Sequence, residues 1–255
     1  TTTAHLLAAM FEASGRHSGV LGTVSNRVGG RDEPVRLTTP ESLDLQALIA
    51  RMVAAGDVAC VMEVSSHALA LGRTAGVRFA AAVFTNLSRD HLDFHADLEE
   101  YYAAKRRLFL GDGEVPAATI AVVNVSGAWG RRLAAECRPA YGPRLWTCAV
   151  EEAADVRAVA LELAADGAAF TLVAPRAGLE QRLEVRLAAR FNVENALTAA
   201  TAALALGLPV DAALRGLSAA QGIPGRFEAV RGGQPFTVLV DYSHTPDSLE
   251  NALLA

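Results

Sequence analysis

Short apolar runs alternate with amphipathic stretches over residues 1 to about 170, and this alternation restricts the possible folds more than any other feature of the chain. It is typical of βαβ units, in which helices cover buried parallel strands. The runs that we expect to form strands are 20–24, 58–64, 79–87 and 119–125, and the expected helices include 40–55 and 97–109. Thr39 is expected to cap the helix over 40–55, with Pro40 in its first turn.

The pattern changes between about 155 and 190, where apolar residues recur at every second position. This period predicts antiparallel strands around a turn at Asp166–Gly167, followed by a long helix over 191–208. A new strand–turn–helix pattern then begins, so we place a domain boundary near 224, dividing the chain into 1–224 and 225–255. The chain starts without Met on a helical pattern and stops within another, which predicts a segment of a longer protein.

The composition argues against several classes of protein. A net charge of −5 argues against a nucleic-acid surface, which would carry clustered basic residues. No apolar run reaches the roughly 18 residues that a membrane helix needs, and no secretory leader is visible. The three cysteines are widely spaced in apolar contexts, which favours buried, reduced thiols in a cytoplasmic protein over disulfides or a zinc site. A monomer is the default expectation.

Three polar clusters stand where an α/β sheet places its functional site, at the carboxyl ends of strands. Glu63 lies near the end of one apolar run and precedes Ser65, Ser66 and His67, and the next run is followed by four Asp and His residues, Asp90, His91, Asp93 and His95. The third position is Lys105 alone. It is notable because it is the single lysine of the chain, whereas the other 22 of the 23 Lys and Arg residues are arginine. A lysine amine can lose its proton and react, which a guanidinium does not do.

These residue types indicate a divalent cation site. Glu, His and Asp at strand ends are able to bind such an ion, and a lysine that has reacted with CO2 presents a carbamate, a carboxylate-like ligand for Mg²⁺. The alternative for each cluster taken singly is a polar loop with local caps. The alternative for Lys105 is an exposed helix lysine without a special role.

Taken together, the motifs resemble those of the Mur ligase family. In the family's order and spacing, the chain contains TTTAHLL, LTTPESLDLQ, MEVSSHALALGR, TNLSRDHLDFHADLEEYYAAK, RFNVENAL, PGRFE and VDYSHTPDSL. TTTAHLL is similar to the end of the family's phosphate-binding loop, Gly-Thr-Asn-Gly-Lys-Thr-Thr-Thr, which makes Thr1 the residue after the loop lysine. The closest resemblance is to the MurE type, which adds an amino acid to a UDP-muramoyl-dipeptide.

The resemblance implies a fold and a set of site residues. The fold would be a P-loop-type parallel sheet flanked by helices, with a small antiparallel subsheet and then the start of a Rossmann-like C-terminal domain. Lys105 would carry a CO2-derived carbamate and, with His91 and Glu63, form the catalytic group. The resemblance implies that Mg²⁺ is bound by Thr1, Glu63, His91 and Lys105. It implies that ATP is bound by Thr1, Thr2, Asn192, Arg226 and Asp241. The UDP-muramoyl-dipeptide would be bound by Thr38, Thr39, Ser65 and Arg73. His244 lies in the same motif as Asp241.

The implied reaction is the ATP-dependent formation of an amide in peptidoglycan precursor synthesis. The D-glutamyl carboxylate attacks the γ-phosphate, and the amine of the incoming amino acid displaces phosphate from the acyl phosphate. The added amino acid is meso-diaminopimelate or L-lysine, and the Arg- and Ala-rich composition favours the former. Because the uridine-binding domain, the loop lysine and most of the C-terminal domain are absent from this sequence, we expect the 255 residues alone not to catalyse ligation.

Several alternatives stay open at this point. The scaffold also serves folylpolyglutamate and cyanophycin synthetases and the other Mur ligases, but these lack the motifs LTTPESLDLQ and EVSSHALALGR in combination. A nucleotide-binding protein without catalysis is favoured weakly by Leu71, where the family often has glutamine, and by Ser126–Gly127, where it often has paired acids. A P-loop hydrolase without an acceptor is a third possibility. Purely structural roles are the alternative for five of these residues. They are helix capping for Thr38, Thr39, Asn192 and Asn195, and a surface ion pair for Arg226.

Overall fold

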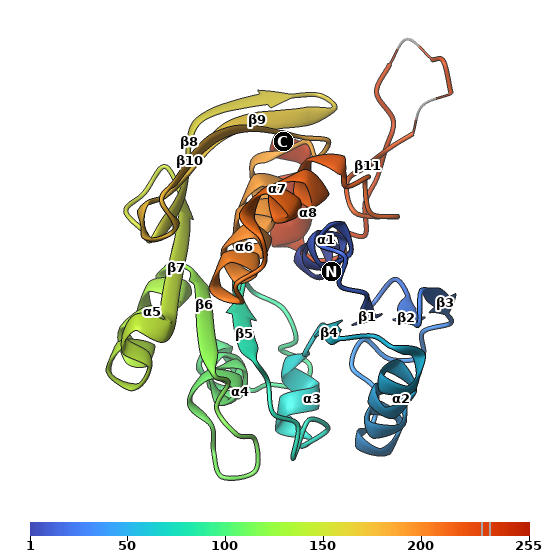
Figure 1. The fold of residues 1–255 in the computed structure, drawn as a ribbon, viewed down its shortest axis with the longest axis vertical. Helices are drawn as coiled ribbons and strands as arrows, with labels where there is room; N and C mark the ends of the chain where they lie inside the picture. The colour runs from blue at the N-terminus through green and yellow to red at the C-terminus, as the bar shows by residue number, and fades with distance from the viewer. Residues whose placement is uncertain (231, 235) are drawn as a thin grey trace.

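The computed structural model describes residues 1–230, 232–234 and 236–255. Its strands are β1 (Ser18–Leu21), β2 (Asn26–Val28), β3 (Arg31–Glu33), β4 (Ala59–Met62), β5 (Ala81–Phe84), β6 (Ile120–Asn124), β7 (Leu145–Val150), β8 (Val156–Ala164), β9 (Gly167–Ala174), β10 (Leu179–Val185), β11 (Glu228–Ala229) and β12 (Leu239–Val240). Its α-helices are α1 (Thr2–Ala13), α2 (Ser42–Ala55), α3 (Ser66–Ala70), α4 (Leu98–Leu110), α5 (Ala128–Tyr141), α6 (Arg190–Ala205), α7 (Val210–Ala219) and α8 (Pro246–Leu254). Figure 1 shows their arrangement.

The strands form two larger sheets, and their order confirms the expected α/β fold class. A six-stranded sheet has the order β10-β9-β8-β7-β6-β5, and a four-stranded sheet has the order β3-β2-β1-β4. Strands β5 to β8 are parallel, as are β1 and β4. The predicted antiparallel strands are β8, β9 and β10, which extend the parallel strands within one sheet instead of forming a separate one.

Helices cover both faces of the six-stranded sheet, because successive side chains of a strand point to opposite faces. In β6, Val122 packs into a core that contains residues of α1 and α6, whereas Ala121 and Val123 pack into a second core with α4 and α5. All three are completely buried. This arrangement leaves the carboxyl ends of the parallel strands as the place where loops from several elements meet.

Helix α2 begins later than the sequence predicts. Its N-cap is Glu41, and Thr39 makes no cap. The Thr39 hydroxyl instead donates to the carbonyl of Glu63 at 2.9 Å and accepts from the backbone N–H of Ser65 at 3.0 Å. The expected cap was therefore wrong, because the Thr39 hydroxyl is hydrogen-bonded to backbone groups of the segment after β4 instead of to its own helix. At its other end α2 stops as expected for a glycine C-cap, with Gly56 at φ +88°.

The last described segment consists of the short pair β11 and β12 and of α8. The backbone N–H of Tyr242 donates to the carbonyl of Gly225 at 2.9 Å, which holds the start of α8 beside the segment before β11. Thr245 caps α8 in a capping box with Ser248. In the part of the chain that the structure describes, no helix has the length and apolar character needed to cross a membrane.

Candidate functional site

A carboxylate held by threonines lies at the end of β4. Glu63 Oε2 accepts the Thr1 hydroxyl at 2.8 Å and the Thr23 hydroxyl at 3.0 Å, and Oε1 accepts the Thr23 backbone N–H at 2.9 Å. The chain therefore presents an acid in direct contact with two threonine hydroxyls.

Gly22 makes this arrangement possible. It follows β1, and a Cβ built on it would lie only 2.4 Å from Oε1 of Glu63. A side chain at this position would push the carboxylate away from Thr23. Glycine is thus required at position 22 because the backbone lies so close to the Glu63 carboxylate, and not because of an unusual backbone angle.

A pocket of about 790 Å³ adjoins this pair and collects the residues predicted for ATP. Its lining includes all five of them, Thr1, Thr2, Asn192, Arg226 and Asp241. Thr1 and Thr2 form the N-terminus of α1, where the first backbone N–H groups of a helix point outward without an intrahelical acceptor. A helix N-terminus of this kind attracts phosphate groups through its N–H groups and its dipole.

Asn192 and Asn195 connect α6 to α1 beside this pocket. The Thr3 hydroxyl donates to Asn195 Oδ1 at 3.1 Å, Asn195 Nδ2 donates to Asn192 Oδ1 at 3.3 Å, and Asn192 Nδ2 donates to the carbonyl of Ala188 at 2.9 Å. Asn192 thus ties the start of its own helix to the preceding loop, but it makes no cap, since the N-cap of α6 is Ala189 and no side chain accepts a hydrogen bond there. Both helices present their N-terminal ends to the same pocket as a result.

Residues before β11 and after β12 also line this pocket. Asp241 Oδ2 accepts the backbone N–H of Phe227 at 2.7 Å, and the Asp241 carboxylate also accepts the Ser243 hydroxyl. The guanidinium of Arg226 lies 5.0 Å from the ring centroid of Tyr242, so this cation stacks on an aromatic face of the same segment. Asp241 therefore holds the turn that carries Arg226 at the pocket.

Lys105 and His91 lie close by, around the ring of Tyr101. Lys105 Nζ is 4.9 Å from the ring centroid of Tyr101, and the His91 ring meets the same ring edge-on at 5.5 Å. Burial lowers the pKa of Lys105 to about 8, although the carboxylate of Asp90 acts in the opposite direction. Asp90 itself lines the pocket, whereas Lys105 and His91 are not among its lining residues.

His91 has an unusual backbone conformation, with φ at +56°. Its N–H donates to the Asp90 carboxylate at 2.7 Å, which fixes this conformation. Burial lowers the pKa of His91 and the charge of Lys105 adds to that shift, while Asp90 opposes it. A left-handed residue held by its neighbours is a common feature of functional loops.

The four residues predicted for the UDP-muramoyl-dipeptide gather beside Glu63. The Thr38 hydroxyl lies 3.2 Å from that of Thr23, and Thr39 bridges Glu63 and Ser65 as described above. Arg73 donates to the carbonyl of Thr39 at 3.3 Å and pairs with Glu41 at 2.8 Å. Ser65 caps α3 by accepting the N–H of Ala68. One compact group thus stands next to the Glu63 carboxylate.

The donor atoms at Glu63 and Thr1 suit Mg²⁺, which prefers hard oxygen ligands and keeps several waters. Among the described residues, no three His, Cys, Asp or Glu side chains are grouped so as to bind a metal ion by themselves. The predicted set does not need such a group, because it combines a carboxylate, a hydroxyl, an imidazole and a modified lysine. The unmodified Lys105 ammonium would repel the cation, whereas its carbamate would attract it.

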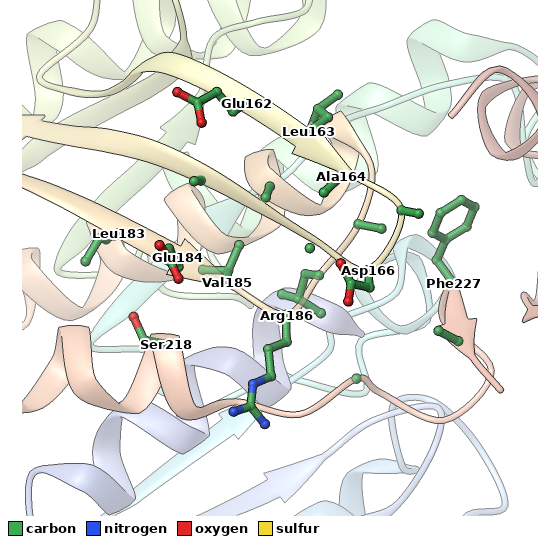
Figure 2. A pocket seen from close by; sticks show the side chains of 18 of the residues that line it. Glu162, Leu163, Ala164, Asp166, Leu183, Glu184, Val185, Arg186, Ser218 and Phe227 are labelled. Atoms are coloured by element: carbon green, nitrogen blue, oxygen red, sulfur yellow. The ribbon is translucent and has the colours of Figure 1, made fainter. Parts of the chain in front are cut away.

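A larger hollow of about 1420 Å³ lies elsewhere, against the hairpin of β8 to β10. Figure 2 shows its labelled side chains, among them Glu162, Glu184, Arg186 and Phe227. None of the residues predicted for catalysis, ATP, metal or substrate lines it. The residues predicted for ATP therefore line the smaller of these two pockets.

Several residues of the site were missed by sequence reasoning. Thr23 lies two residues after the end of β1, and its position at a strand's carboxyl end was a usable signal. Asn124 and Glu194 line the pocket together, with Asn124 Nδ2 donating to Glu194 Oε2 at 3.5 Å and burial raising the pKa of Glu194. Their proximity depends on the packing of α6 against β6 and left no signal in the sequence.

Comparison with known proteins gives consistent matches over the whole chain. Residues 1–203 match the profile of the Mur ligase middle domain. The chain is 43% identical to the UDP-N-acetylmuramoyl-L-alanyl-D-glutamate–2,6-diaminopimelate ligase of Bacillus velezensis, over 99% of this chain and 51% of that protein. It is 44% identical to the enzyme of the same name from Gloeobacter violaceus, over 100% of this chain and 50% of that protein.

Solved structures agree with these matches. A structure that carries the same ligase name superposes with a TM-score of 0.82 at 31% identity, covering 100% of this chain and 50% of that one. MurF from Acinetobacter baumannii has a TM-score of 0.75 at 20% identity, which is a likeness of fold alone. The chain spans about half the length of the relatives that it matches.

Proposed function

This chain belongs to the Mur ligase family, and we propose that the protein containing it is the ligase that adds diaminopimelate to UDP-N-acetylmuramoyl-L-alanyl-D-glutamate using ATP. The observation that carries the proposal is the pocket that joins Thr1, Thr2, Asn192, Arg226 and Asp241 next to Glu63. The relatives named above, at more than 40% identity, carry this ligase name.

The first step brings two anions together, the D-glutamyl carboxylate and the γ-phosphate of ATP. The carboxylate oxygen forms a bond to phosphorus, ADP leaves, and an acyl phosphate results. Catalysis then depends on positioning and on stabilising the developing charge. In this chain the N-terminus of α1 and Arg226 would face the phosphates, while Asn192 would contact the nucleotide from α6.

Mg²⁺, when bound, would neutralise phosphate charge and orient the γ-phosphoryl group. Thr1, Glu63, His91 and Lys105 are the residues that we propose to hold it. For Lys105 the ammonium first loses one proton, the resulting neutral amine attacks the carbon of CO2, and a second proton leaves the nitrogen, so that the positive side chain becomes a negative carbamate. Lysine, unlike arginine, can lose its proton to allow this, which is our explanation for the lone lysine.

In the second step the amine of the incoming amino acid attacks the acyl carbon and phosphate leaves with the C–O bond electrons. The amine loses one proton as the amide forms. Thr38, Thr39, Ser65 and Arg73 are proposed to hold the nucleotide peptide, since they lie together beside Glu63. We further propose that 1–224 is the ATP-binding domain, that 225–255 begins the C-terminal domain, and that the protein is a cytoplasmic monomer.

The test uses the full-length protein and follows phosphate release from ATP. UDP-muramoyl-L-Ala-D-Glu is present or absent, and meso-diaminopimelate and L-lysine are offered separately. We expect release to require both the nucleotide peptide and diaminopimelate. A Lys105→Arg variant is expected to lose at least about a hundredfold in kcat, with partial rescue by added short carboxylates, because one ligand of the charge-neutralising group is missing.

The same assay separates the competing functions. Phosphate release that is indifferent to the nucleotide peptide would indicate a hydrolase, and binding of both ligands without product would indicate a protein that has lost catalysis. Product formed from a folate or a polypeptide acceptor would indicate another ligase on this scaffold. A Lys105→Arg variant as active as the parent would refute the role given to the lone lysine.

A further inference from the structure

An aromatic stack connects Lys105 to the turn at the start of α3. The rings of His95 and Tyr101 are stacked, with centroids 5.3 Å apart and planes 20° from parallel. His95 Nε2 lies 2.9 Å from the hydroxyl of Ser66, and the Ser66 and His95 side chains belong to residues that are 1% and 2% exposed. On its other side Tyr101 lies under Lys105 Nζ, at 4.9 Å.

We propose that Tyr101 is a positioning residue for Lys105, and that His95 and Ser66 hold the Tyr101 ring in place. This inference rests on the proposed function, in which Lys105 becomes a carbamate. Tyr101 touches neither substrate nor metal in this proposal. It acts by restricting the lysine side chain to the conformations that reach the edge of the ATP pocket.

The geometry of α4 supports this role. Tyr101 and Lys105 are four residues apart on one helix, so their side chains lie on the same face, one above the other. A free lysine side chain samples many rotamers, and a ring fixed beside it removes part of that freedom. Tyr101 is itself only 6% exposed, so its ring cannot swing away without opening the core.

The stack also explains why a buried histidine and a buried serine occur together. A buried polar group is costly unless it has a partner, and the pair between Ser66 and His95 satisfies both side chains. Ser66 directly follows Ser65, which we propose to contact the nucleotide peptide. The line Ser66–His95–Tyr101 therefore gives Lys105 a fixed position relative to the proposed substrate side of the site.

Tyr102 is a matched control for this proposal. It is the next residue of α4 and is 1% exposed, but its ring faces Trp129 at 5.0 Å and the guanidinium of Arg132 at 4.4 Å. Loss of its ring would weaken packing without changing the surroundings of Lys105. A role of Tyr101 in packing alone predicts the same behaviour for both tyrosines.

The experiment measures carbamate on Lys105 directly. Full-length wild type and the variants Tyr101→Leu, Tyr101→Phe, Ser66→Ala and Tyr102→Leu are equilibrated with carbon-13 bicarbonate, and the carbamate carbon is quantified by NMR. The bicarbonate concentration for half occupancy, kcat and the KM for ATP are measured alongside, with a thermal unfolding curve for each variant. Lys105→Arg is the negative control, since its NMR spectrum should lack the carbamate carbon signal.

We expect Tyr101→Leu to raise the half-occupancy concentration about fivefold, the factor that corresponds to regaining roughly half of a lysine's rotamer freedom. Its kcat should fall in parallel at saturating ATP with an unchanged KM. Tyr101→Phe should restore the wild-type value, Ser66→Ala should raise it about twofold, and Tyr102→Leu should leave it unchanged.

Equal occupancy in Tyr101→Leu and wild type would overturn the proposal, and so would an equal loss in Tyr101→Leu and Tyr102→Leu. If Tyr101→Leu does not fold, Ser66→Ala decides, since an unchanged half-occupancy concentration in that variant contradicts the proposed line of contacts. A wild type without any carbamate signal would instead refute the carbamate role of Lys105 in the proposed function, and the phosphate-release assay then shows whether the ligase assignment survives.

Discussion

Replacing Gly22 with alanine tests whether Glu63 is held by its neighbours as the structure describes. The new Cβ would lie 2.4 Å from Oε1 of Glu63, well inside van der Waals contact, which begins at 3.4 Å. The carboxylate must move, and its hydrogen bonds from Thr23 and Thr1 at 2.8 to 3.0 Å are then weakened or lost. Because the group in the way is the end of a side chain, the fold itself can survive the change.

The size of the effect follows from these contacts. Overpacking of this kind costs about 1–3 kcal/mol, and a lost hydrogen bond to a charged group costs about 1.5–3 kcal/mol. The lower entropy of the unfolded alanine chain returns about 0.4–1 kcal/mol. Allowing for partial relaxation of Glu63, we expect the free energy of unfolding to fall by about 1–3 kcal/mol. A displacement of about 1 Å at the site is expected to lower kcat/KM about a hundredfold.

The assay combines urea unfolding with phosphate release by the full-length protein. Gly222→Ala is the matched control, since a Cβ built there meets nothing within 4 Å and its φ is not positive. That variant should lie within about 0.5 kcal/mol of wild type. The reasoning fails if Gly22→Ala is as stable and as active as Gly222→Ala.

Two further predictions concern the pocket and Lys105. Asn195→Ala removes the hydrogen bonds to Thr3 and Asn192. It should lower the free energy of unfolding, measured in urea, by about 1–2 kcal/mol and raise the KM for ATP severalfold. An unchanged KM would contradict the role of Asn195 in connecting α6 to α1. The initial rate at which Lys105 regains its carbamate, at constant dissolved CO2, should rise about tenfold from pH 7 to a plateau with a midpoint near pH 8, because burial lowers the lysine pKa to about 8 and only the neutral amine reacts. The stability of the fold should also rise with pH. Between pH 8 and the ordinary lysine pKa of 10.5, the unfolded chain binds more protons than the folded chain. The unmodified lysine therefore destabilises the fold fully below pH 8, and this destabilisation disappears as the pH rises from 8 to 10.5. A midpoint near 10.5 would show that Lys105 is not buried as described.

The sequence predicted the elements whose pattern is local. The strands β4, β5 and β6 were recognisable as short continuous apolar runs, which is typical of buried parallel strands, and the helices α2, α4 and α6 by apolar residues with a period of about 3.6. The hairpin β2–β3 was not predicted, since its strands are only three residues long and hold Asn26 and Asp32, residue types that are frequent in turns. Pairing of Asn26–Val28 with β1, and not local preference, makes this segment a strand.

The side chains of the site divide in the same way. Glu63, His91 and Lys105 stood out in the sequence alone, because an acid inside an apolar run, histidines at a strand end and a single lysine are each unusual. Only the tertiary structure decided how they are held: Thr23 and Thr1 contact Glu63, and His95 stacks on the Tyr101 ring that lies beside Lys105.

Thr39 marks the boundary between the two kinds of information. Its place before Pro40 predicts a helix cap, yet its hydroxyl binds Glu63 and Ser65, two residues of the segment between β4 and α3. A sequence pattern specifies which hydrogen-bonding group a residue offers and which local partner could accept it. The choice among partners depends on which backbone groups the folded chain brings within about 3 Å, and those groups come from segments that are distant along the chain.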